Sequence, residues 1–164
     1  MKFKKQLTKY GMQAALNVTA CLAKQQRFED LSNKLLGAVA IFSAQKIQDS
    51  RPRTIKELGT CWQNAFPSPK QVPLVDINED TVYAEIRTPC PLKGSGDLKA
   101  CHRMMAYDRA YMNHFGGKFV VLRSQAEFGV NVCKVAIQFA DKDNSTKLVH
   151  AHERENVLLG VLQL

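Results

Sequence analysis

Three prolines, Pro67, Pro69 and Pro73, divide the chain into two parts whose hydrophobic residues repeat with different periods. Before the prolines, apolar side chains recur at the spacing of an amphipathic helix. After them, apolar and polar residues alternate in short runs, as in half-buried strands. Because proline fixes φ and lacks an N–H, the cluster itself predicts an extended connection. The change of period therefore predicts an α+β fold, with N-terminal helices packed on an antiparallel sheet.

The part before the prolines predicts three helices. They span Lys2–Gln26, Leu31–Asp49 and Ile55–Phe66. The third helix should begin at a capping box formed by Thr54 and Glu57. Val18 to Cys21 also resembles a lipoprotein cleavage box, but polar residues interrupt the apolar segment before it, which favours a first helix.

The part after the prolines predicts the order β-β-α-β-β. A hairpin of Leu74–Ile77 and a strand beginning at Thr81 comes first, and a helix from Leu98 to Phe115 follows, ended by Gly116 and Gly117. Strands over Phe119–Gln125 and Asn131–Ala140 then form a second hairpin.

Length and composition limit the possible classes of protein. A chain of 164 residues predicts a single domain, with a helical part (1–66), a sheet part (72–140) and a tail (141–164). In the tail we expect a helix from Glu153 to Leu162, the alternative being a strand that completes an oligomer. No apolar run reaches the roughly 20 residues of a transmembrane helix. The net charge is +8, but the basic residues are scattered except at the N-terminus, which favours a solvated surface over a nucleic-acid face. Five cysteines without a Cys-x-x-Cys pair favour reduced thiols in a cytoplasmic protein.

The helix from Leu98 carries the residues that are best suited to catalysis or ligand binding. Helical spacing places Cys101, Met105, Asp108 and Met112 on one stripe, with Met104 at its edge, facing the sheet. An acid on the apolar side of a helix is costly unless it is paired or hydrogen-bonded. Asp108 is therefore either a functional carboxylate or a structural one that bonds a backbone N–H or Arg123.

Three cysteines are expected to lie near this carboxylate. Cys90 shares the parity of the inward residues of its strand, Cys101 opens the helix, and Cys133 lies on the apolar face of the last strand. Each alone is more often a small hydrophobic residue than a ligand or nucleophile. Together they predict a common pocket. Near a helix N-terminus, the thiolate of Cys101 would be favoured by the helix dipole, and Asp108 could orient a water or a substrate amine.

Metal binding is a further alternative. Thiolates bind zinc or iron–sulfur clusters, but the spacings between these cysteines carry no zinc signature, so no cofactor is required by the sequence. His102 should point roughly 100° away from Cys101 around the helix. His150 and His152 share a face if their segment is extended. The metal, if any, stays unknown at this stage.

The segment from Tyr83 to Phe139 resembles a known family. Its motifs are Cys90-Pro91, then Cys101-x-x-Met104 with Asp108, then Leu122-Arg123-Ser124-Gln125-Ala126-x-x-Gly129-x-x-x-Cys133. They resemble the L-2-amino-thiazoline-4-carboxylic acid hydrolase-like family, and are also similar to 4-vinyl reductase small-ligand-binding domains. The chain departs from the pattern after Cys133, where Lys134, Val135 and Ala136 stand in place of acidic and aromatic residues.

The resemblance implies a hydrolase-like enzyme that opens a thiazoline or small cyclic amide by adding water. A thiazoline would yield an N-carbamoyl cysteine, and the enzyme would belong with hydrolases of C–N bonds. Cys101 and Asp108 would be catalytic. The ligand-binding residues would be Cys90, Met104, Met105, Met112, Ser124, Gln125 and Cys133.

Two other hypotheses belong to different functional classes. The first is a non-catalytic module, similar to 4-vinyl reductase domains, that holds a small hydrophobic ligand or a metal such as zinc or iron; its methionines suit an adaptable apolar pocket. The second is an accessory subunit whose basic N-terminal helix docks on an acidic partner, or which forms a homo-oligomer.

Overall fold

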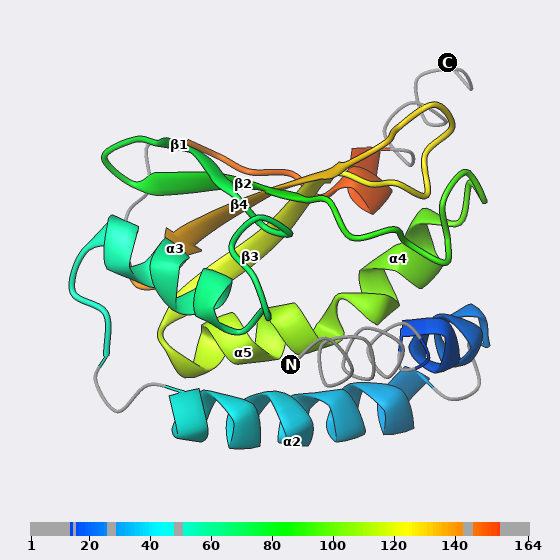
Figure 1. Cartoon of the computed structure of the whole chain (residues 1–164), viewed down its shortest axis with the longest axis horizontal. Helices are drawn as coiled ribbons and strands as arrows, with labels where there is room; N and C mark the ends of the chain where they lie inside the picture. Colours follow the sequence, from blue (N-terminus) through cyan, green and yellow to red (C-terminus); the bar gives the residue numbers. More distant parts are fainter. Residues whose placement is uncertain (1–13, 15, 26–28, 48–50, 143–145, 155–164) are drawn as a thin grey trace, which may run out of the picture.

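The fold is that of a computed structural model, which describes residue 14 and residues 16–25, 29–47, 51–142 and 146–154. The helices α2 (Glu29–Ile47) and α3 (Ile55–Asn64) precede the strands β1 (Leu74–Ile77) and β2 (Thr81–Ile86). The helices α4 (Leu98–Met104) and α5 (Ala106–His114) follow, and then β3 (Gly117–Arg123) and β4 (Cys133–Phe139). The predicted α+β fold and the order of its elements are confirmed (Figure 1).

Both ends of the chain extend beyond the described residues. Residues 16–24 are helical, as predicted for the first helix, and the rest of that predicted helix lies outside the described residues. The tail forms a helical turn at 151–154. The remainder of the helix predicted from Glu153 to Leu162 also lies outside the described part.

The sheet has four antiparallel strands in the order β1-β2-β4-β3. In β4, Ile137 is paired with Val82 on one side and with Phe119 on the other, so the apolar residues of the three strands lie on a common face. This register pairs Cys133, the first residue of β4, with Ile86, the last residue of β2. The end of this strand pair is where the chain of β2 continues toward Cys90.

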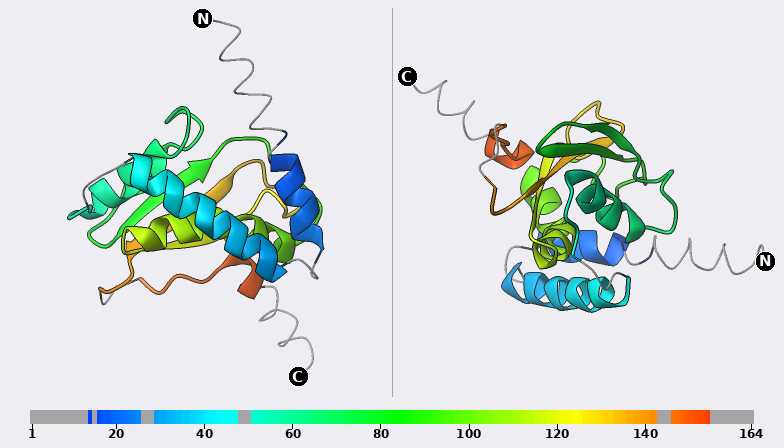
Figure 2. Two further views of the ribbon diagram at one scale, coloured as in Figure 1. Left: turned by 90° about the horizontal axis from the view of Figure 1, so that it is seen from below. Right: turned by 90° about the vertical axis from the view of Figure 1, so that its left-hand side faces the viewer.

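The helices form two layers on one face of the sheet. Helices α3 and α5 contact the strands, and α2 packs against α5 on the side away from the sheet (Figures 1 and 2). The helical residues 16–24 are held to α4 because Arg103 Nε donates a hydrogen bond of 2.6 Å to the carbonyl of Ala23. The opposite face of the sheet is partly covered by the returning tail, where Gln138 Nε2 donates to the carbonyl of Thr146 at 3.0 Å.

The single helix predicted from Leu98 to Phe115 is wrong, because it is interrupted at Met105. The φ and ψ of Met105 are −81° and 12°, outside the α-helical region. In a continuous helix the carbonyl of His102 would accept from the N–H of Ala106. Instead, Arg109 Nη1 donates to that carbonyl at 2.6 Å. A side chain thus takes over a backbone acceptor, and the helix restarts with a new first turn.

Two features of the surface bear on partners. In the described part of the chain, no helix is long and apolar enough to cross a membrane. Residues 16–24 and α2 expose the apolar side chains Val18, Leu22, Val39, Ile41 and Phe42. The accessory-subunit hypothesis depends on this surface and stays a prediction.

Helix α3 approaches the sheet closely at Gly59. A Cβ at this position would lie 2.8 and 3.0 Å from the two γ-methyl carbons of Val82 in β2. We expect Gly59→Ala to lower the free energy of unfolding by about 1–3 kcal/mol, because the overlap outweighs the gain in helix propensity. Urea denaturation followed by circular dichroism measures the change.

Gly37 in α2 provides the matched control for this substitution. Its Cβ would meet only the Cβ of Ala110, at 3.9 Å, which is ordinary van der Waals contact. Gly37→Ala should therefore raise the free energy of unfolding by up to about 1 kcal/mol. Equal effects of the two substitutions would contradict the close packing of α3 on β2.

Candidate functional site

A buried carboxylate, Asp108, lies in the first turn of α5. Its side chain is directed into the interior and only 8% of the residue is exposed. Trp62 of α3 donates a hydrogen bond from Nε1 to Asp108 Oδ1 at 2.9 Å. The predicted pairing of Asp108 with Arg123 is wrong, because Arg123 Nε instead pairs with Glu127 Oε2 at 3.1 Å. The indole N–H is a neutral donor, so among the described residues the carboxylate has no cationic partner in direct contact.

The pKa of Asp108 reflects this environment. Burial raises it from its ordinary value of 3.8 to about 6, while the Trp62 hydrogen bond, Arg109 and the residue's own backbone N–H act in the opposite direction. Burial wins because a neutral donor compensates only part of the lost hydration of the charge. The carboxyl group therefore exchanges its proton near neutral pH, as a general acid or base requires.

The segment that follows β3 connects the predicted cysteines. Gln125 N donates to Cys133 Sγ at 3.3 Å, and Gln125 Oε1 accepts from Cys90 N at 3.2 Å. Ser124 Oγ donates to Cys101 Sγ at 2.9 Å. Ser124 and Gln125 thus reach all three cysteines, and Cys101 and Cys90 each raise the pKa of Cys133, as close neighbours do. The structure brings these cysteines into one region.

Their thiols are protonated at neutral pH. Burial raises the pKa of Cys101 to about 11 and that of Cys133 to about 12, and it also raises the pKa of Cys90. The expected stabilisation of the Cys101 thiolate by the helix dipole is wrong, because burial of the thiol outweighs it. All five cysteines are free thiols.

A cavity of about 320 Å³ lies beside Asp108. Five residues predicted to bind a ligand line it together with Asp108, namely Cys90, Met104, Met105, Gln125 and Cys133. Three other predicted site residues are not among its lining residues. Met112 is fully buried beside Gly117, Ser124 is fully buried, and Cys101 is 2% exposed.

Sequence reasoning missed the outer wall of the cavity. Leu16, Thr19 and Leu36 reach it from the first two helices, and Ala65 and Phe66 reach it from the end of α3. The sequence predicts Phe66 as a core residue. It contains no signal that three separate helices would meet over the cysteines, because those contacts depend on how the helix layers pack.

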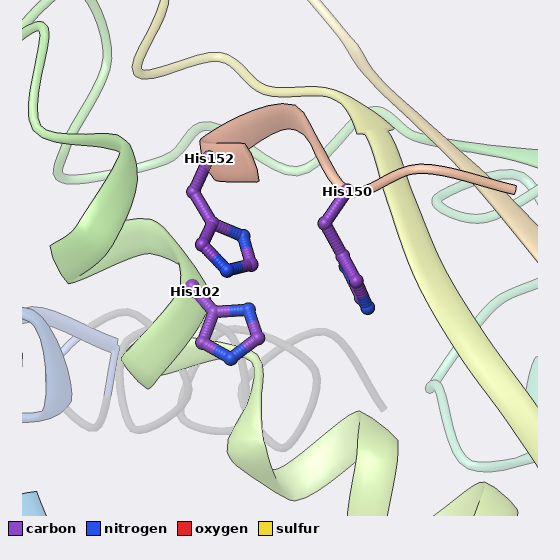
Figure 3. Close-up of side chains that lie close together, drawn as sticks. All are labelled: His102, His150 and His152. Atoms are coloured by element: carbon purple, nitrogen blue, oxygen red, sulfur yellow. The ribbon is translucent and has the colours of Figure 1, made fainter. Parts of the chain in front are cut away.

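A second group of side chains is formed by His102, His150 and His152. One nitrogen from each ring lies within 4.8 Å of the others (Figure 3). Within the described ranges, no other group of three or more His, Cys, Asp or Glu residues could hold one metal ion. The alternative of a metal held by the cysteines therefore has no support in the geometry, and the histidines offer the donor set instead.

The histidines are neutral at pH 7. Burial, followed by the charge of Arg109, lowers the pKa of His102 from 6.5 to about 3. Burial also lowers the pKa of His150 and of His152, and Glu153 acts against it in both.

Comparisons with known proteins add no relatives to this picture. No family model matches the chain, and no curated protein and no solved structure matches it either. The resemblance to the thiazoline hydrolase-like family and to 4-vinyl reductase domains stays a prediction.

The environment of Asp108 makes stability depend on pH. A group whose folded pKa is raised stabilises the fold when protonated, and this contribution disappears as the pH rises from its ordinary pKa through the folded value of about 6. Replacement of the carboxyl group by an amide keeps an acceptor for Trp62 and removes the titration. We expect Asp108→Asn to gain about 2–3 kcal/mol of unfolding free energy relative to the wild type between about pH 4 and pH 7.

Urea denaturation of both proteins at several pH values measures this difference. Asp76→Asn, the same change on an exposed residue of β1, is the matched control and should not reproduce it. A difference between Asp108→Asn and wild type that does not change with pH would contradict the raised pKa.

Proposed function

We propose that this chain is a binding module for a small, mainly apolar molecule, held in the cavity beside Asp108. The observation that carries the proposal is a cavity of about 320 Å³ whose lining is mainly apolar, with Thr19, Thr88, Asp108 and Gln125 as its polar residues. This volume falls within the roughly 300–1,000 Å³ of small-molecule sites. Cys90, Cys133 and the two methionines contribute polarisable, uncharged surface, which suits an apolar ligand.

The polar lining residues determine which polar groups a ligand can carry. Gln125 also lines the cavity, but its amide is already bonded to the backbone, since Nε2 donates to the carbonyls of Ile86 and Thr88 and Oε1 accepts from Cys90. Asp108 is the one acidic group among the described lining residues, with Oδ1 held by Trp62, and the buried hydroxyl of Thr88 has no hydrogen-bond partner within the described part of the chain. A ligand with an apolar body and one N–H or O–H donor matches this arrangement. The resemblance to 4-vinyl reductase domains supports the same class of function.

A neutral fluorescent probe with this chemistry, N-phenyl-1-naphthylamine, tests the proposal. We expect saturable binding of one molecule, seen as increased probe fluorescence. Ala65→Phe places a ring in the cavity and should weaken binding at least about tenfold, because the lost volume excludes the probe. Ala38→Phe, the same change on an exposed position of α2, should leave binding unchanged. Equal binding by the two variants would refute the cavity as the site.

A second candidate function, hydrolysis, is favoured by the pKa of Asp108. A carboxylate that titrates near pH 6 beside a cavity is suited to remove a proton from water. In a thiazoline, this water would add to the ring carbon between nitrogen and sulfur. The C–S bond would then break, the proton left on the added oxygen would pass to the ring nitrogen as the carbonyl forms, and Asp108 would return the other proton to the departing sulfur, giving an N-carbamoyl cysteine. In a cyclic amide the broken bond would be C–N.

In this candidate reaction the nucleophile is water, and Cys101 forms no covalent bond with the substrate. Its thiol is protonated at neutral pH and does not line the cavity. The residue serves instead as the partner of Ser124, whose Oγ also accepts from the N–H of Ala126 at 3.0 Å.

The hydrolytic candidate predicts a specific pH profile. With L-2-amino-thiazoline-4-carboxylic acid as substrate, kcat/KM should rise about tenfold per pH unit below about pH 6 and level off above it, because the base must be ionised. Asp108→Asn should lower kcat by roughly 10²–10⁴-fold. Cys101→Ala should retain most of the activity. Substrate consumption followed by NMR measures the rates.

The two candidates are separated by their combined outcomes. Probe binding without turnover identifies a binding module. Turnover that is lost with Cys101→Ala, and kept with Asp108→Asn, would exclude the general-base assignment.

A further inference from the structure

We propose that His102, His150 and His152 form a binding site for a divalent transition-metal ion of the zinc class. Helix α4 supplies one imidazole and the turn that begins at His150 supplies two. The site lies outside the cavity beside Asp108, shares no lining residue with it, and is independent of the proposed function.

The geometry of the three rings supports a common ion. The ring centroids of His102 and His152 are 3.9 Å apart, and His150 lies 5.3 Å from each of them. Figure 3 shows the rings of His102 and His152 one above the other, with the ring of His150 standing to one side. Tetrahedral zinc, with bonds of about 2.0–2.1 Å, needs nitrogens about 3.3 Å apart. Nitrogens within 4.8 Å reach this spacing through side-chain rotation.

Local structure holds the two histidines of the tail in place. The N–H of His150 donates to Glu153 Oε2 at 3.1 Å, while the N–H of Glu153 donates to the carbonyl of His150 at 3.0 Å. The first bond is half of a capping box, the second closes a backbone turn, and together they fix the start of the helical turn. Ala151, between the two histidines, is buried. The turn is thereby anchored so that both flanking imidazoles approach α4.

One ring nitrogen of the three histidines lacks a hydrogen-bond partner within the described residues. His150 Nδ1 is buried and makes no hydrogen bond within the described part of the chain. A buried polar atom without a partner is destabilising, and an ion bound through this nitrogen removes that cost. This observation is independent of the distances between the rings and marks a nitrogen that is available to a ligand.

The donor set selects the class of ion. Imidazole nitrogens suit zinc, copper, nickel and iron, whereas calcium and magnesium require oxygen ligands. Three protein ligands leave a fourth position open, as in catalytic zinc sites. A surface depression of about 400 Å³ borders His150 and is also lined by Arg109 and Lys118. The open position therefore favours an anionic fourth ligand, such as hydroxide or a carboxylate.

Arg109 is the main feature that opposes a cation here. Its Nη1 lies 3.4 Å from Nδ1 of His102, which is long for a hydrogen bond, and the same nitrogen bonds the carbonyl of His102 at 2.6 Å. Neutral His102 has one ring lone pair, and the shorter bond of Arg109 to the carbonyl leaves this lone pair to a metal ion when Nδ1 does not accept from Arg109. The carboxylate of Glu153, and an anion in the fourth position, offset part of the repulsion.

Metal binding to the full-length protein tests the proposal. The protein should carry no polyhistidine tag and should have the exposed thiol removed by Cys21→Ser. Calorimetry with Zn²⁺ should show one saturable site, and Ca²⁺ and Mg²⁺ should not compete. With Co²⁺, visible absorption of a nitrogen-ligated ion should appear without the near-ultraviolet band of a cobalt–thiolate bond. Absence of a saturable Zn²⁺ site, or a thiolate band, would overturn the proposal.

Single substitutions assign the ligands. His102→Gln, His150→Gln and His152→Gln should each weaken Zn²⁺ binding by more than roughly tenfold, since even groups outside the first coordination sphere contribute 10–100-fold. His114→Gln is the matched control, because His114 lies outside the group. Circular dichroism of the metal-free variants shows that each is folded. Unchanged affinity in all three variants, or an equal loss in His114→Gln, would refute the assignment.

Discussion

The hydrogen bond between Trp62 and Asp108 is the interaction on which the interior of this protein depends. It joins α3 to α5 beneath the sheet and provides a neutral donor to a carboxylate that has lost its hydration. A cationic partner would have held the pKa low and made the group purely structural. The indole leaves the carboxyl group able to change its charge near neutral pH. One pair of side chains therefore both packs two helices together and supplies a titratable group.

Much of the fold could be predicted because its signals are local. The capping box of Thr54 and Glu57 forms as predicted, and the alternation after Pro73 marks the strands. The buried stripe of the helix predicted from Leu98, with Cys101, Asp108 and Met112, follows from helical spacing alone. The interruption at Met105 could not be predicted, because it depends on the Arg109 side chain replacing a backbone donor.

The candidate site was less predictable because its parts come from distant segments. Trp62 and Asp108 are 46 residues apart, and nothing in either segment indicates the other. The cysteines were expected to converge, and hydrogen bonds from Ser124 and Gln125 show how they do so. Their protonation was not predicted, since the burial of a thiol is a property of the packed protein. The sequence places His150 and His152 on one face if their segment is extended, and only the return of the tail to α4 brings His102 to them.

The shortness of α4 has a consequence for how the two regions communicate. This helix presents Met104 to the cavity and His102 to the tail, and despite the interruption at Met105 it stays bonded to α5 through Arg109. An occupant that displaced α4 on one side would change the alignment of the side chain on the other. By thermodynamic reciprocity, any such coupling acts with equal strength in both directions. Helix α4 is therefore the element through which the cavity and the histidine group would be coupled.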